Sequence, residues 1–143
     1  NKKRKELSEN LVENFRDKVF KNLDREGDLK KGEILKKIHK LTWAHAGIVR
    51  DAEGLKSGLG AIEKLREELR GDVGCNTFEV LEVKNLALTA EIVMRAALAR
   101  QETRGTHLRS DFPGAKEEMA WQHINVCYKK DGEIEATVVP SRS

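Results

Sequence analysis

The chain has 143 residues, of which 38% are hydrophobic and 36% are charged, and its formal net charge is +3. This length is sufficient for one domain with a hydrophobic core of its own. Acidic and basic residues are interleaved almost throughout, without the clustered lysine and arginine excess of a nucleic-acid-binding domain, so no nucleic-acid partner is expected.

Cysteine use and apolar runs narrow the class further. Cys75 and Cys127 are too few and too far apart for a disulfide framework or a zinc knuckle, so we expect two free thiols in a reducing cytosol. No apolar run follows the basic N-terminus, so no signal peptide is expected. The most apolar stretch, 86–99, contains Glu91 and Arg95 and is too short to cross a bilayer. It therefore predicts a core helix and no direct membrane insertion.

Apolar residues at helical spacing predict three amphipathic helices in the first half of the chain. The stripe of the second helix includes His45, and Asp51 is the expected N-cap of the third. Gly58 and Gly60 either weaken the third helix or let another helix come close. His39 and His45 lie on different faces of the second helix, which is poor geometry for a metal site. The three predicted ranges are 7–23, 31–49 and 51–70.

A fourth helix, over 78–102, is apolar on almost every side from residue 86 onward, which is typical of a helix surrounded by others. Glu91 and Arg95 are four residues apart and should pair. Both tryptophans, Trp43 and Trp121, are expected to anchor the core. Near-complete burial is expected for Leu86, Ile92, Val93 and Leu98.

The final forty residues have a different pattern. After Gly105 the periodicity stops and a loop is expected; apolar residues then alternate with polar ones over 124–128 and 134–138, around an Asp-Gly turn at 131–132. The predicted fold is mostly α, a three- to four-helix bundle with an irregular C-terminal tail that contains a small β-hairpin. Residues 1–102 would form the bundle, and 103–143 the charged loop and hairpin packed on it, within one domain.

One charged segment, 100–113, follows the most apolar helix directly. It contains three arginines, one histidine and two carboxylates. Charges that leave a core helix need partners, so a polar network is expected, with at least one Arg–Asp or Arg–Glu pair and the remaining groups facing outward. Contact with a ligand and a docking surface are the alternative interpretations.

The same segment carries a resemblance to a known family. Its pattern, R-x-E-T-R-G-x-H-x-R-x-D-F-P, closely resembles the C-terminal domain of the flavoproteins of succinate dehydrogenase and fumarate reductase. Residues 42–50 are similar to the family's W-x-x-x-G-(I/V)-x-R helix end. Residues 121–123 resemble its W-x-x-H element, with one residue fewer. The resemblance covers roughly residue 34 to the end, and L-aspartate oxidase shares the R-G-x-H core.

The resemblance implies a domain that supports catalysis elsewhere in a longer flavoprotein that interconverts succinate and fumarate. In that family FAD sits on a separate domain with a G-x-G-x-x-G loop, and Gly58-Leu59-Gly60, the nearest match here, lies inside a predicted helix. No catalytic, cofactor-binding or metal residue is therefore expected in this chain, which should be inactive alone.

The implied partners are the FAD-binding and capping domains of the parent and an iron–sulfur subunit, in the cytoplasm or at a membrane through partner subunits. An L-aspartate oxidase domain and a free-standing helical interaction module remain alternatives. The residues expected to contact other domains or subunits are Arg104, His107, Arg109, Asp111, Trp121 and His123.

Overall fold

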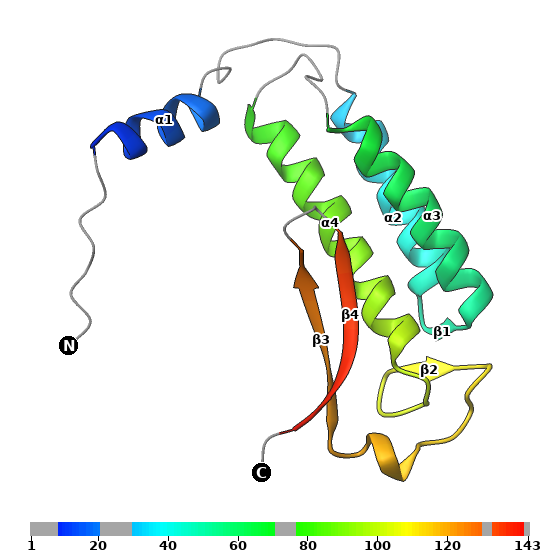
Figure 1. The fold of residues 1–143 in the computed structure, drawn as a ribbon. Helices are drawn as coiled ribbons and strands as arrows, with labels where there is room; N and C mark the ends of the chain where they lie inside the picture. The colour runs from blue at the N-terminus through cyan, green and yellow to red at the C-terminus, as the bar shows by residue number, and fades with distance from the viewer. Residues whose placement is uncertain (1–8, 21–29, 71–76, 130–132, 142–143) are drawn as a thin grey trace, which may run out of the picture.

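The computed structural model describes residues 9–20, 30–70, 77–129 and 133–141. Within these ranges, four helices, a 3-10 turn and four strands follow one another (Figure 1). They are α1 (Glu9–Phe20), α2 (Lys31–Ala46), β1 (Val49–Arg50), α3 (Ala52–Glu68), α4 (Thr77–Ala99), β2 (Leu108–Arg109), η1 (Glu117–Met119), β3 (Gln122–Tyr128) and β4 (Ile134–Pro140).

Helix α4 is the centre of the molecule. It packs against α2 and α3 on one side and against the β3–β4 hairpin on another (Figure 1). The core forms where apolar stripes of the three helices meet, as the helical spacing predicts. Its fully buried members include Ile38 from α2, Leu55 and Ile62 from α3, and Val83 and Met94 from α4. The predicted helical bundle with a terminal hairpin is thus confirmed.

The burial of α4 differs from the prediction, which had this helix enclosed on almost every side. Its buried apolar positions are spaced by three or four residues, at 83, 87, 90, 94 and 97, and the buried Glu91 lies on the same side, so only one stripe of the helix is enclosed. Leu86, Ile92 and Leu98 flank this stripe and are partly exposed, and Val93 is 47% exposed. The prediction of near-complete burial for these four residues is wrong, because one face of α4 has no neighbour within the described residues.

The prediction that both tryptophans anchor the core is also wrong. Trp43 is 73% exposed and Trp121 is 81% exposed. Trp43 follows Ile38 by five residues, which turns its side chain well away from the stripe of α2 that enters the core. Both indoles therefore lie on the surface of this chain.

Helix α3 shows why glycine occurs inside a helix. A Cβ atom on Gly58 would lie 2.6 Å from the Cβ of His45 on α2 and 3.1 Å from the sulfur of Met94 on α4. The close approach that Gly58 allows is confirmed, and His45 is half-buried against it. The predicted N-cap is confirmed as well, since Asp51 Oδ1 accepts from the backbone N–H of Gly54 at 2.7 Å.

Two charged residues of α4 form the expected pair, since Arg95 Nε donates to Glu91 Oε1 at 2.8 Å. Glu91 is buried and also accepts from Arg66 of α3, so its charge has two cationic partners.

Within the described ranges, no helix is long and apolar enough to cross a membrane.

The strands include one pairing that the sequence pattern did not predict. The hairpin is antiparallel, from Gln122↔Pro140 to Tyr128↔Ile134, as expected. Strands β1 and β2 are two residues each and pair in parallel, Val49↔Leu108 and Arg50↔Arg109. Helix α2 accordingly ends at Ala46, three residues before its predicted end. The predicted turn at 131–132 lies outside the described residues.

Candidate functional site

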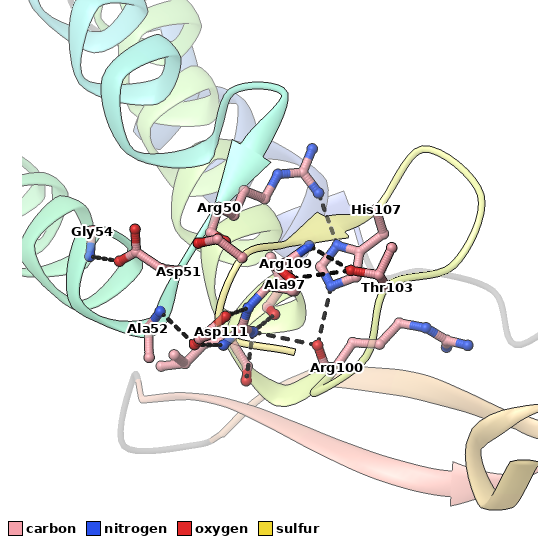
Figure 2. A network of polar contacts seen from close by, with 12 residues as sticks. Arg50, Asp51, Ala52, Gly54, Ala97, Arg100, Thr103, His107, Arg109 and Asp111 are labelled. Atoms are coloured by element: carbon pink, nitrogen blue, oxygen red, sulfur yellow. Dashed lines mark hydrogen bonds and ion pairs between the residues drawn. The ribbon is translucent and has the colours of Figure 1, made fainter. Parts of the chain in front are cut away.

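The side chain of Arg109, which belongs to β2, lies against the C-terminal end of α4. Its side chain is almost completely buried, and its Nη1 donates to the carbonyl oxygen of Ala97 at 2.6 Å and to that of Arg100 at 3.3 Å (Figure 2). The last carbonyls of a helix lack partners within the helix and carry its negative dipole end. The buried guanidinium of Arg109 therefore finds acceptors at this helix end.

Asp111 connects this helix end to the start of α3. Its carboxylate accepts two parallel bonds from Arg109, each 2.7 Å long. Oδ2 also accepts from the backbone N–H of Ala52, in the first turn of α3, at 2.9 Å. The Arg109–Asp111 pair thus places a cation at a helix C-terminus and an anion at a helix N-terminus, which both macrodipoles favour.

Arg50 and His107 cap a third helix end. Arg50 Nε donates to the carbonyls of Ala46 and Gly47, at 3.2 and 2.9 Å, at the end of α2. Its Nη1 donates to His107 Nδ1 at 2.9 Å, while His107 Nε2 lies 3.0 Å from the carbonyl oxygen of Arg100 (Figure 2). A guanidinium can only donate and a carbonyl can only accept, so His107 is the neutral tautomer with its proton on Nε2.

Glu102 secures the loop that carries these groups. It is fully buried and accepts from Arg100 at 2.5 Å, from Arg104 at 3.1 Å and from the backbone N–H of Lys116 at 3.0 Å. Gly105 has a φ of +58°, a left-handed conformation that glycine adopts at least cost, and it turns the chain back toward His107. We call Arg50, Glu102, His107, Arg109 and Asp111 the cap cluster.

The electrostatics of the cap cluster follow from these contacts. The bond from Arg104, opposed by burial, lowers the pKa of Glu102 to about 2. The bonds from Arg109 lower the pKa of Asp111 to about 2. Burial, reinforced by the charges of Arg50, Arg109 and Arg100, lowers the pKa of His107. At neutral pH the carboxylates are therefore charged and the imidazole is not.

Four of the six expected contact residues lie in or beside the cap cluster. The predicted pairing of arginine with a carboxylate is confirmed by Arg109–Asp111 and Arg104–Glu102. Arg104 lies at the surface, and Arg109 is enclosed by its own chain.

The other two, Trp121 and His123, are exposed around the start of β3. Arg100, which pairs with Glu102 of the cap cluster, also donates from Nη1 to the carbonyl oxygen of Gln122 at 3.3 Å, and Gln122 lies between Trp121 and His123. Sequence reasoning did not assign site roles to Arg50 and Glu102, although both stand in the quoted motifs.

The polar groups of the cap cluster are paired within the chain. Among the described residues, no buried side-chain nitrogen or oxygen lacks a hydrogen-bond partner, and no group of three or more metal-binding side chains occurs. Gly58 faces His45 and Met94 inside α3, so Gly58-Leu59-Gly60 cannot approach a phosphate. The contacts of the cap cluster are therefore suited to fixing three helix ends.

Comparison with known proteins places this geometry in a family. The sequence family described as fumarate reductase flavoprotein C-term matches residues 35–141. One subunit of the fumarate reductase (CoM/CoB) of Methanothermobacter marburgensis is 34% identical over 76% of the chain. An L-aspartate oxidase of Pyrococcus furiosus is 36% identical over 57% of the chain. The chain spans 21% of the first relative and 14% of the second.

The fold agrees with a solved structure. A chain of the quinol fumarate reductase of E. coli superposes on 95% of this chain with a TM-score of 0.72 and 18% identity, and the match takes up 26% of that chain. At that identity the match concerns the fold alone. The family match, in contrast, extends from α2 to β4 and includes both segments that build the cap cluster. The chain belongs to the fumarate reductase flavoprotein C-terminal family.

Proposed function

We propose that this chain is the C-terminal domain of an FAD-dependent flavoprotein that interconverts succinate and fumarate. The domain does not carry out the redox step. It packs beside the flavin-binding and capping domains of the same polypeptide and beside an iron–sulfur partner subunit. Flavin chemistry would be supplied by the cofactor in those other domains, while this domain contributes rigid positioning.

The observation that carries the proposal is the cap cluster. Its ionised side chains are satisfied within the chain, and His107 has both ring nitrogens engaged. A general acid or base needs a nitrogen or oxygen within reach of the substrate. A cluster that is instead closed on itself and ties three helix ends together supports a bracing role. The 34% identity to a fumarate reductase subunit favours succinate and fumarate as the substrates of the parent.

An L-aspartate oxidase parent is the second candidate, favoured by the 36% identity to such an enzyme. The two are separated by assaying the full-length protein with three reactions. These are succinate oxidation with an electron-accepting dye, fumarate reduction with a reduced viologen, and L-aspartate oxidation followed by peroxide release. Turnover of the dicarboxylate pair is expected. Turnover of L-aspartate alone would refute the proposal and establish the second candidate.

The bracing role is tested separately, with Arg109→Ala in the full-length protein. We expect looser packing of the domain and weaker retention of the partner subunit, with an unchanged pH dependence of turnover, because a guanidinium stays charged and transfers no proton. Arg70→Ala is the matched control, since Arg70 is exposed at the end of α3 and pairs only with its neighbour Glu67 in the described structure. Normal assembly with abolished turnover would instead place Arg109 in the active site.

Exposed residues beside the cluster are the proposed contacts to other domains and subunits. Arg104, Trp121 and His123 offer side chains to a neighbour directly. Arg109, His107 and Asp111 act through the loop and helix ends that they hold in place.

A further inference from the structure

A groove of about 790 Å³ lies beside the cap cluster, between the C-terminal half of α2 and the loop before β2. Trp43, Gly47 and Ile48 line one wall, and Thr106 and Leu108 line the other. The two walls come from segments far apart in the sequence, the W-x-x-x-G-(I/V)-x-R motif and the R-G-x-H motif. The bond from Arg50 to His107 joins them, so the shape of the groove depends on the cluster.

Large apolar side chains are exposed in and beside the groove. Trp43 is 73% exposed, Ile48 65% and the adjacent Val49 63%, and Leu108 contributes from the opposite wall. Contiguous exposed apolar surface on a soluble domain marks a site of interaction. Exposed tryptophan is also the side chain that most often carries binding energy once it is covered.

The described side chains that line the groove carry no negative charge. Among the described residues that line the groove, none is acidic, and Arg50 supplies a permanent positive charge. Lys36 and Lys40 are exposed on the same side of α2, seven and three residues before Trp43. An apolar centre with a basic rim is complementary to an apolar side chain flanked by carboxylates.

We propose that this groove is the docking surface for the flavin-binding part of the same polypeptide, which inserts an apolar side chain flanked by acidic residues between Trp43 and Leu108. The inference rests on the proposed function, in which such a part exists. It names the surface and the chemistry of the contact, which the bracing role alone does not.

The size of the groove favours a tethered occupant over a separate protein. A stable complex between free proteins buries about 1,200–2,000 Å² in total. A few side chains around one groove supply only a fraction of such an interface. A segment of the same chain needs less, because its tether gives it an effective concentration of about millimolar. The shared segment is 21% of one relative and 14% of the other, so these relatives are about five to seven times longer than that segment, and a tethered occupant of ample size is available in the family.

The first test measures the exposure of Trp43 in the full-length protein. Its side chain is oxidised with hydroxyl radicals, and the rate is read by mass spectrometry in the native protein and in denaturant. Docking predicts a rate several-fold lower in the native protein. An uncovered groove leaves Trp43 largely exposed, so similar rates in the two states would overturn the proposal. The readout does not depend on which substrate the enzyme uses, so it can fail while the proposed function stands.

The second test asks for the sign of the partner's charge. Trp43→Glu and Trp43→Arg both remove the indole from an exposed position of α2, and Trp43→Phe retains an apolar ring as the control. Calorimetry of the full-length proteins should show one cooperative transition for Trp43→Phe and a separated, lower-temperature transition for Trp43→Glu, with Trp43→Arg between them. A separation as large for Trp43→Arg as for Trp43→Glu would refute an acidic occupant. An unchanged transition in Trp43→Glu would refute docking at this groove.

Discussion

The same substitution at two glycines of one helix should change the stability of the fold differently. Gly58 and Gly60 both lie inside α3, and replacing either with alanine removes the same backbone freedom. Gly58 is buried with α2 and α4 close on either side, whereas Gly60 is exposed with nothing within 4 Å of the position of an added Cβ. The pair therefore separates helix propensity from interhelix packing.

The magnitudes follow from these surroundings. Alanine is favoured over glycine in a helix interior by about 1 kcal/mol, so Gly60→Ala should stabilise the fold by up to that amount. At Gly58 the new Cβ would lie 2.6 Å from the Cβ of His45, an atom fixed to the backbone of α2. Relief requires α2 and α3 to move apart, and overpacking of this kind costs about 1–3 kcal/mol. Gly58→Ala should therefore be less stable than Gly60→Ala by about 1–3 kcal/mol.

Urea unfolding of the 143-residue chain, followed by far-UV circular dichroism, measures both variants against the parent. We expect the midpoint to rise for Gly60→Ala and to stay level or fall for Gly58→Ala, with similar slopes. Equal stabilisation by the two substitutions would mean that α2 and α3 do not approach closely at His45, and would refute the packing described above.

Further predictions concern the core, the pH dependence and the cofactor. Met94→Ala should cost about 2–5 kcal/mol because Met94 is fully buried, and Val93→Ala, at an exposed position, should change stability by no more than about 0.5 kcal/mol; the same urea titration decides. The pKa values of Glu102 and Asp111 are lowered to about 2 from ordinary values of 4.5 and 3.8, so both carboxylates stabilise the fold above those ordinary values and lose that effect as pH falls toward 2. Glu102→Gln should therefore be less stable at neutral pH, and its free energy of unfolding should change less steeply with pH in acid. The pKa of His107 is lowered in the folded chain, so its contribution to stability is complete above the ordinary pKa of 6.5 and decreases as pH drops below that value. Nitrogen NMR at neutral pH should detect a proton on Nε2 of His107 only. The purified 143-residue chain should be colourless, and a flavin spectrum near one equivalent would contradict a cofactor site located in other domains.

The helices and the hairpin could be predicted because their signals are local. Apolar residues at three- and four-residue spacing identify α2, α3 and α4, and alternation identifies β3 and β4. Burial was harder, because it depends on which faces have neighbours. Trp43 and Trp121 are large and apolar, which favours burial, yet no other described element covers them.

The cap cluster was only partly predictable for a related reason. Proximity along the chain predicted that an arginine of the charged segment would pair with a carboxylate, as Arg109 does with Asp111. The contacts to α2 and α3 join positions 57 to 59 residues apart, as in Arg50–His107 and Ala52–Asp111, and such pairs leave no periodic trace in the sequence. Strands of two residues, like β1 and β2, are too short for alternation to reveal them.

The β1–β2 pairing also bears on the order of events in folding. It joins the two ends of a segment that contains all of α3 and α4, so the entropy of closing this long loop disfavours the pairing early in folding, and we expect it to form after the helices have packed. Interactions that form after the transition state slow unfolding while leaving the folding rate nearly unchanged. The polar contacts around Arg109 should therefore slow the unfolding of the domain and have little influence on its folding rate.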